Sequence, residues 1–375
     1  MPERLPMTTS FDVAVIGAGP AGAAAAIAAA RSGARVALFE RSAFPRNKVC
    51  GCCLTARAVA ELRALGAGAA LDGACELRSV RVACGTGSIE LRREAGVAIG
   101  RDVLDTRLVA IAREAGVEVF MECHAQVLAA GAIAATPRDG DTHAIEARTI
   151  IAADGLAGAS LDACEGFRWT LAPRSHMGFG ATVPAHAVAC EEHEIRLRVS
   201  DGGYIGSVRL PDGTVDIAAA VDPRRLRDAG NVATCALELL GSDVRDEGAL
   251  LTARWKGTPQ LTRRRARVAA EGILVVGDAT GYVEPFTGEG MTWAITTGRA
   301  AGELAAGKLT VGARQPHLAW PAMHARLVGG SRLRCRLIAR ALRSPTLVRS
   351  AIGLGGIARP PLEWLASSIG REVPA

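Results

Sequence analysis

The chain has 375 residues, of which 49% are hydrophobic, and a formal net charge of +6 at pH 7. This length buries a substantial core in about two or three units, and the lack of a long uninterrupted apolar stretch argues against a membrane-spanning segment. The ten cysteines form no disulfide framework and the seven histidines have no metal-ligand spacing, which predicts reduced thiols, a cytoplasmic protein and no metal site. Nucleic-acid binding has no motif or aromatic platform to support it.

The first predicted elements form a strand–turn–helix unit. The apolar run 13–16 predicts a buried parallel strand, the glycine-rich turn 17–22 follows it, and small residues over 23–30 predict a helix. A second strand over 35–39 ends at Glu40. In this setting a GxGxxG turn lets a pyrophosphate rest on the helix N-terminus, and the carboxylate accepts hydrogen bonds from the ribose of an adenosine. Because Glu40 would repel a 2′-phosphate, the site does not favour NADP.

Helices and antiparallel strands are predicted through the middle of the chain. The spacing predicts helices over 55–65 and 104–115, with alternating antiparallel strands over 75–100 between them. Residues 178–221 are predicted to form a β-rich insert over the substrate cavity, with a hairpin turn at 211–213.

A second glycine-rich segment follows later in the chain. The apolar strand 273–276 delivers Gly277 and Asp278, and the loop 285–290, Pro-Phe-Thr-Gly-Glu-Gly, leads into a helix from about Met291. The two glycine-rich segments suit the two ends of one dinucleotide cofactor.

Together these segments resemble flavoproteins of the p-hydroxybenzoate hydroxylase type and, within them, the geranylgeranyl reductase family. Residues 44–51 are similar to that family's FPRxKxCG segment, 287–291 to its TGEGI, and 150–155 to its ADG strand end. The resemblance implies FAD as the cofactor, with Asp278 on the ribityl or pyrophosphate side and Arg101 opening a helix near it. It also implies that the helix after the loop points at N1 and C2=O of the isoalloxazine, where its dipole would stabilise negative charge.

The resemblance implies an α/β fold with an α+β insert: a Rossmann-like FAD-binding domain, an antiparallel β-sheet substrate domain and C-terminal helices. We expect the FAD-binding domain at 10–75, 100–165 and 265–310, the substrate domain at 76–99 and 166–264, and a helical region at 311–375. The candidate cofactor-binding residues are Gly17, Ala18, Gly19, Pro20, Ala21, Gly22, Glu40, Arg41, Lys48, Cys50, Gly51, Arg101, Val127, Asp154, Gly277, Asp278, Pro285, Gly288, Gly290 and Met291.

Cys50 and Tyr204 are the candidate catalytic residues. The resemblance puts Cys50 between flavin and substrate, where the thiol either handles a proton and lines the cavity or only packs. Tyr204 either donates a hydrogen bond to the substrate or is a half-buried sheet residue. Lys48 either steers an anion or is a solvated loop charge.

Two reactions fit the resemblance. The FPRxKxCG and TGEG matches favour hydrogenation of a C=C bond in a small, largely apolar metabolite, with hydride from flavin N5. The segment 203–211 lacks the tryptophan of the family's YxWxFP stretch, which favours a flavin monooxygenase that uses NAD(P)H and O2. A flavin-binding redox sensor without turnover is a more remote alternative. Since no second fingerprint is present, NAD(P)H would bind transiently or a partner protein would supply the electrons.

A basic amphipathic helix is predicted over 332–343. We expect one apolar face and an opposite basic face, composed of Leu333, Leu337, Ile338, Ala341 and Leu342 against Arg332, Arg336, Arg340 and Arg343. Such a helix either makes a peripheral contact with an anionic membrane, which would suit a small lipophilic or aromatic substrate, or docks on its own domain with its arginines in solvent.

Overall fold

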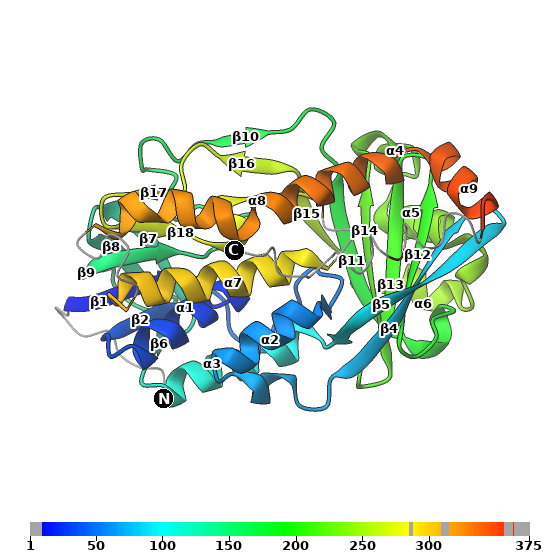
Figure 1. The fold of residues 1–375 in the computed structure, drawn as a ribbon. Helices are drawn as coiled ribbons and strands as arrows, with labels where there is room; N and C mark the ends of the chain where they lie inside the picture. Colours follow the sequence, from blue (N-terminus) through cyan, green and yellow to red (C-terminus); the bar gives the residue numbers. More distant parts are fainter. Residues whose placement is uncertain (1–9, 285–287, 309–314, 356–362, 364–375) are drawn as a thin grey trace.

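The computed structural model describes residues 10–284, 288–308, 315–355 and 363. Two extended sheets lie side by side, and long helices pack along the first of them (Figure 1). Within the described residues, none of the helices combines the length and the apolarity needed to cross a membrane.

The first sheet is built on parallel strands. In spatial order it contains β17 (Ala269–Ala270), β18 (Ile273–Val275), β9 (His143–Ala152), β1 (Ser10–Ile16), β2 (Val36–Phe39) and β6 (Glu118–Phe120). β1 pairs in parallel with β2 and β9, and β18 pairs in parallel with β9. β7 (Cys123–Ala129) and β8 (Ala132–Pro137) continue from β9 as an antiparallel hairpin. The predicted Rossmann-like arrangement is confirmed.

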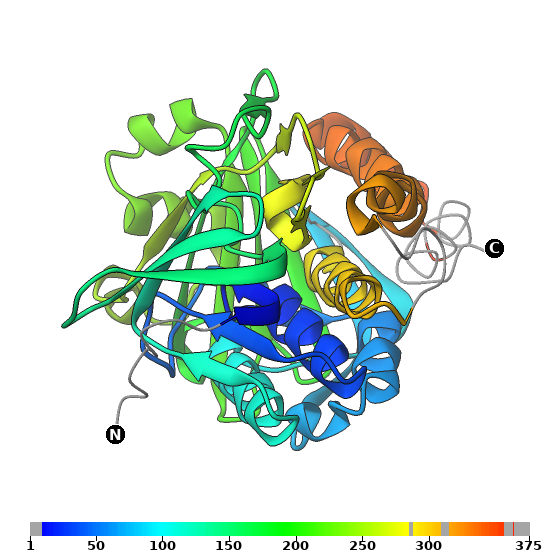
Figure 2. The same cartoon turned by 90° about the vertical axis from the view of Figure 1, so that its left-hand side faces the viewer.

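The two faces of β1 bury alternate side chains, as expected for a central strand. Val13 and Val15 pack against helices α1 (Pro20–Arg31), α3 (Arg101–Glu114) and α7 (Glu289–Ala305). Ala14 and Ile16 face the other way, into a core shared with β7 and β8. Figure 2 shows the helices on one side of the sheet and the β7–β8 hairpin on the other.

Helices α1 and α7 pack closely enough to bring the two glycine-rich segments together. A Cβ on Gly298, in the middle of α7, would lie 2.1 Å from the carbonyl oxygen of Ala21 in the first turn of α1. Only glycine permits this approach between the two backbones. The packing therefore fixes the start of α1 against α7.

The second sheet is mainly antiparallel. In spatial order it contains β15 (Lys256–Gln260), β11 (Met177–Pro184), β14 (Thr214–Val221), β13 (Gly203–Arg209), β12 (Glu194–Ser200), β4 (Cys75–Cys84), β5 (Gly87–Ala98) and β3 (Cys53–Leu54). The predicted hairpin turn joins β13 to β14. The loop that carries Cys50 and Cys52, called here the cysteine-rich loop, leads into β3. β3 pairs with β5 and so attaches this loop to the second sheet.

Side chains on β14 alternate between two environments. Val215, Ile217 and Ala219 pack against the helices on the outer face of the sheet. These helices are α4 (Pro223–Asp228), α5 (Val232–Leu240) and α6 (Glu247–Leu251). Asp216 and Ala218 point to the opposite face and line the cavity between the two sheets.

Shorter elements complete the framework. Helix α2 (Ala56–Ala64) begins at Thr55, whose hydroxyl accepts a hydrogen bond from the N–H of Ala58, close to the predicted start. The remaining short elements are the strands β10 (Trp169–Leu171), β16 (Arg263–Arg265) and β19 (Gly281–Tyr282) and the 3₁₀ helices η1 (Gly68–Leu71), η2 (Ala185–Ala187), η3 (Gly241–Asp243) and η4 (Gly277–Thr280).

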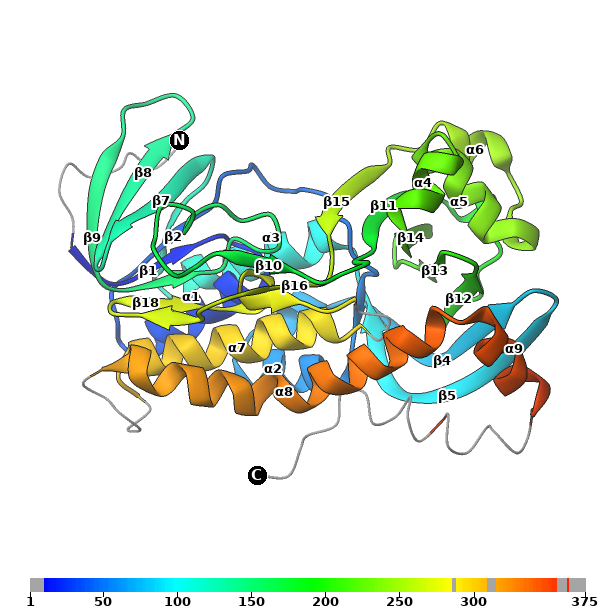
Figure 3. The same cartoon turned by 90° about the horizontal axis from the view of Figure 1, so that it is seen from above.

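The C-terminal helices α8 (Pro316–Leu342) and α9 (Pro345–Gly353) run from α7 to the second sheet (Figure 3). The expected separation into an apolar and a basic face is wrong. Ile338 and Leu342 are buried, whereas Leu333 and Leu337 are more than half exposed. Arg332 is half-buried and donates a hydrogen bond to Thr280, whereas Arg343 donates one to Glu284 but stays exposed. The peripheral membrane contact stays a prediction.

Candidate cofactor and substrate cavity

The turn between β1 and α1 forms the phosphate end of the cavity. Helix α1 begins at Pro20 without a side-chain cap, so the positive end of its dipole faces the cavity. A Cβ on Gly22 would lie 1.8 Å from the carbonyl oxygen of Gly17, which means that the turn closes only with glycine there. The turn therefore fits a pyrophosphate.

Two guanidinium groups lie opposite this turn. A Cβ on Gly19 would lie 3.8 Å from Nη2 of Arg101 and 4.0 Å from Nη2 of Arg46. Asp105 fixes Arg101 by accepting hydrogen bonds of 2.8 and 2.7 Å from Nε and Nη2. These cations complement the negative charges of a pyrophosphate. Arg46 was missed from the sequence, although it lies in the same FPRxKxCG segment as Lys48.

Glu40 is buried at the end of β2, beside the turn. Its Oε2 accepts hydrogen bonds from the N–H of Ala18 at 2.9 Å and from Arg46 at 3.3 Å, and its Oε1 accepts one from the N–H of Ser42 at 3.0 Å. A carboxylate oxygen has two acceptor positions, so Oε1 can also accept from a ribose hydroxyl. The geometry fits the adenosine role expected for Glu40.

We expect Glu40→Ala to weaken FAD binding by about 1–3 kcal/mol, because the variant removes a charged acceptor of the ribose and of the turn. Titration of the apo-protein with FAD, followed by flavin fluorescence, measures the effect. Glu118→Ala is a matched control, since Glu118 pairs with Arg35 at the protein surface. Equal affinity in the two variants would contradict the assignment.

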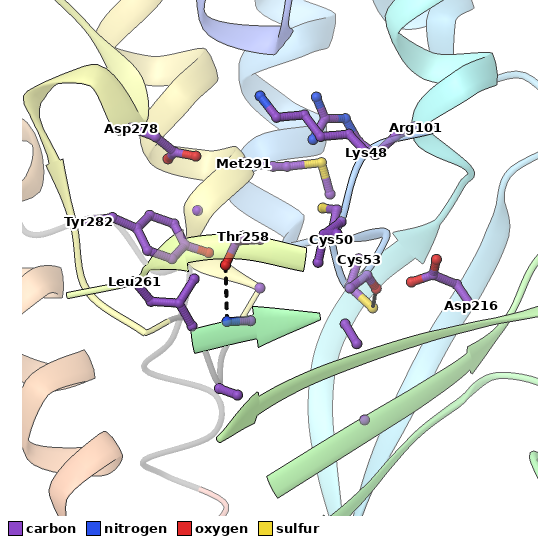
Figure 4. Close-up of a pocket in the computed structure, with 18 of the residues that line it drawn as sticks. Lys48, Cys50, Cys53, Arg101, Asp216, Thr258, Leu261, Asp278, Tyr282 and Met291 are labelled. Atoms are coloured by element: carbon purple, nitrogen blue, oxygen red, sulfur yellow. Dashed lines mark hydrogen bonds between the residues drawn. The ribbon is translucent and has the colours of Figure 1, made fainter. Parts of the chain in front are cut away.

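The second glycine-rich segment closes the cavity from the opposite side (Figure 4). Asp278 lies in η4, directly after β18, and its side chain lines the cavity. Gly288, Gly290 and Met291 line it at the N-terminus of α7. Pro285 lies outside the described residues.

Lys48 lies in the cavity wall. Burial, followed by the charges of Arg101 and Arg46, lowers the pKa of its ammonium group, while the charge of Asp278 acts in the opposite direction. Lys48 is half-buried and lines both lobes of the cavity, which favours the anion-steering interpretation over that of a solvated loop charge. The side chain adds a third cation near the turn between β1 and α1.

Most sequence candidates meet in this cavity, whose two lobes share Gly19, Lys48 and Asp278. The candidates that line it are Gly17, Gly19, Pro20, Ala21, Glu40, Arg41, Lys48, Cys50, Gly51, Arg101, Asp154, Tyr204, Asp278, Gly288, Gly290 and Met291.

The remaining described candidates lie behind the cavity wall. Ala18 donates its N–H to Glu40, and Gly22 and Gly277 make close packing contacts in the two turns. Val127 is 1% exposed, with its side chain in the core between β7 and the first sheet. The side chain of Val127 therefore does not reach the cofactor cavity.

The second sheet forms the apolar end of the cavity. Ile195, Leu197 and Val208 line it with the small residues Gly206 and Ala218. The small residues leave space beside the larger side chains. An apolar surface of this kind favours a lipophilic ligand.

Tyr204 is buried in the same wall, and this burial raises the pKa of its hydroxyl well above the usual value. The phenol is therefore neutral at neutral pH. It can contact a ligand while its ring packs against the sheet.

The cysteine-rich loop lies between the charged and the apolar ends. A hydrogen bond with Cys52, together with the charge of Arg101, lowers the pKa of the Cys50 thiol to about 6, although burial opposes this shift. This shift favours the thiolate form of Cys50, and its expected role in handling a proton stays a prediction.

Sequence reasoning missed Asp216, which is buried in the apolar wall near this loop. The sequence did contain a signal for it. Side chains alternate between the two faces of a strand, so Asp216 is placed on the same face as Ala218 and Ala220. A carboxyl group on an otherwise apolar face marks a candidate functional residue. Among the described residues, no group of three His, Cys, Asp or Glu side chains is arranged to hold a metal ion.

Comparisons with known proteins agree with this geometry. Residues 10–315 match the family model described as an FAD binding domain. The chain is 31% identical over 316 residues to a menaquinone reductase of Mycobacterium tuberculosis, covering 79% of this chain and 76% of the relative. It is 32% identical over 320 residues to a digeranylgeranylglycerophospholipid reductase of Methanopyrus kandleri, covering 79% and 80%.

A solved structure shares the fold. The geranylgeranyl bacteriochlorophyll reductase-like protein of Thermoplasma acidophilum superimposes with a TM-score of 0.73 at 18% identity, covering 92% of this chain and 91% of that protein.

Proposed function

Because the chain belongs to the family of flavoproteins with this FAD binding domain and resembles the geranylgeranyl reductases, we propose that it hydrogenates a C=C bond in a lipophilic substrate. The family match makes it an FAD-dependent oxidoreductase. The apolar wall of the cavity carries the proposal that the substrate is lipophilic. Both relatives are named as reductases, and their named substrates are lipids.

The residues present fit FAD. The uncapped N-terminus of α1 and the guanidinium of Arg101 suit the pyrophosphate, and Glu40 suits the adenosine ribose. Bound and reduced FAD supplies hydride at N5. Gly288 and Gly290 at the N-terminus of α7, and Cys50 and Gly51 on the facing loop, line the cavity between the phosphate end and the apolar wall. There they orient a substrate and exclude water.

We propose that the electrons come from NAD(P)H, bound transiently, or from a partner protein. Support comes from the sequence, which carries one GxGxxG fingerprint, already used by FAD. The rates of flavin reduction by NADH and by NADPH, measured in the absence of substrate, test this source.

The reaction is tested with holoenzyme reduced by dithionite under anaerobic conditions. We expect a geranylgeranyl lipid or menaquinone to reoxidise the flavin and to gain two hydrogens, detected by mass spectrometry. Menaquinone reduced at its ring and not in its side chain would contradict C=C hydrogenation. A product that forms only with O2 and carries oxygen from labelled O2 would identify a monooxygenase instead.

A cavity-filling pair of variants tests whether the apolar wall binds this substrate. A Cβ on Gly206 would have Leu197 Cδ1, at 3.6 Å, as its nearest neighbour, so Gly206→Ala fits. Gly206→Leu would extend into the cavity. We expect Gly206→Leu to abolish reoxidation by the lipid while FAD content stays unchanged, and Gly206→Ala to retain activity. Equal activity in both variants would place the substrate elsewhere.

A further inference from the structure

Asp216 is the polar exception on the cavity face of β14. It is 7% exposed and lines the same cavity as Cys50. Its Oδ2 is buried and has no hydrogen-bond partner among the described residues. Figure 4 shows the carboxyl group beside the cysteine-rich loop, near Cys53. Since a buried acceptor without a partner is costly, this oxygen suits either a proton or a ligand.

The groups around Asp216 favour the proton. Burial and then the negative charge of Cys50 raise the pKa of the Asp216 carboxyl well above its usual value. Asp102 acts in the same direction, whereas Cys52, by hydrogen bonding, and Arg101, by its charge, act in the opposite one. Figure 4 shows Cys53, on β3, near Asp216, and burial raises the pKa of this thiol to about 12, so it is neutral.

The pKa values of Cys50 and Asp216 are therefore shifted in opposite directions. The thiol is shifted toward its ionised form and the carboxyl group toward its neutral form. Cys52 lies within hydrogen-bond reach of both side chains, and its own pKa is raised by its hydrogen bond with Cys50 and by burial. Such a pair of oppositely shifted groups is typical of acid–base sites.

We propose that Asp216, buried on the cavity face of β14, is the general acid that protonates the substrate carbon. This role rests on the proposed C=C reduction. The proton would then come from a residue of the second sheet, on the opposite side of the cavity from the cofactor-binding turn.

The step balances. Hydride from bound, reduced FAD would supply two electrons and one hydrogen and form a C–H bond at one carbon of the C=C bond. The O–H bond of Asp216 breaks, its electron pair stays on the carboxylate, and the proton forms the second C–H bond. One proton from solvent restores the acid.

The first test compares Asp216→Asn with wild type in a single anaerobic turnover of reduced holoenzyme with the lipid. We expect the variant to be about 10²–10⁴-fold slower, the range for loss of general acid catalysis, with unchanged FAD content. Asp212→Asn is the matched control, because Asp212 is exposed in the turn of the same hairpin. Equal rates for Asp216→Asn and wild type would overturn the proposal.

The pH profile of the wild type tests the same role without a variant. An acid must be protonated to act, so the raised pKa of Asp216 moves the loss of rate to a higher pH than the usual carboxyl value of about 3.9. A rate that already falls at that usual value would overturn the proposal. We expect Asp216→Asn to lack this decline.

A readout that needs no activity distinguishes failure of this proposal from failure of the proposed function. The rate of Cys50 alkylation by iodoacetamide is measured against pH in the apo-protein by peptide mass spectrometry. If Asp216 is neutral, Asp216→Asn leaves the midpoint nearly unchanged. If Asp216 is ionised, removing its charge lowers the midpoint, and the acid role is wrong. An unchanged midpoint together with a wild type that reduces no tested lipid would reject only the C=C reduction.

Discussion

Gly22→Ala is expected to yield protein without flavin. The added methyl group would lie 1.8 Å from the carbonyl oxygen of Gly17 and 3.2 Å from Cβ of Ala153, whereas non-bonded heavy atoms prefer about 3.5–4.0 Å. Either the turn opens or α1 moves away from β1, and both changes displace the N–H groups that face the pyrophosphate. We expect loss of bound FAD, and a free energy of unfolding lower by about 1–3 kcal/mol, the usual cost of overpacking.

Flavin absorbance and denaturant unfolding of the purified variant measure both effects. Gly329→Ala is the matched control, because Gly329 is exposed in α8 and an added Cβ would have no neighbour within 4 Å. That variant should keep its flavin and gain up to about 1 kcal/mol of stability from helix propensity. A yellow Gly22→Ala protein of wild-type stability would contradict the close packing described for the turn.

The cofactor half of the site could be predicted because its signals are local in sequence. A strand, a glycine turn and a small-residue helix follow one another over 13–30, and Glu40 ends the next strand. Parallel strands end at the same edge of a sheet, so the glycine turn after the first strand and Glu40 after the second are expected to lie close together. Asp278 follows the same logic, because it directly follows β18.

The acid–base part of the site could not be predicted in the same way. Asp216 and Cys52 lie on separate segments, and their approach depends on β3 pairing with the edge of the second sheet. Nothing in the sequence near Cys52 specifies this pairing. Similarly, the helical spacing of 332–343 identified a helix, but only tertiary packing determines that Arg343 reaches Glu284.

Arg101→Ala is expected to have the other large effect, because this guanidinium serves three partners. It pairs with Asp105, which is completely buried, it lies opposite Gly19 at the phosphate end, and its charge helps to keep Cys50 ionised. Removing one member of a buried ion pair costs about 3–5 kcal/mol when the other charge is left uncompensated, and here Asp105 would keep only Arg46, at 3.7 Å. We therefore expect a large loss of unfolding free energy together with loss of FAD.

The alkylation midpoint of Cys50 separates the electrostatic effect of Arg101 from its structural effect. Without the positive charge and hydrogen bond of Arg101, the pKa of Cys50 should rise from about 6 toward the usual thiol value of about 8.5. Arg101→Lys keeps the charge but loses the two-point contact with Asp105, so it should keep more of the low midpoint than of the stability. Arg113→Ala, at an exposed position in the last turn of the same helix, should change neither. If Arg101→Ala lowered stability but left the midpoint near 6, the ionisation of Cys50 would depend on Cys52 rather than on Arg101.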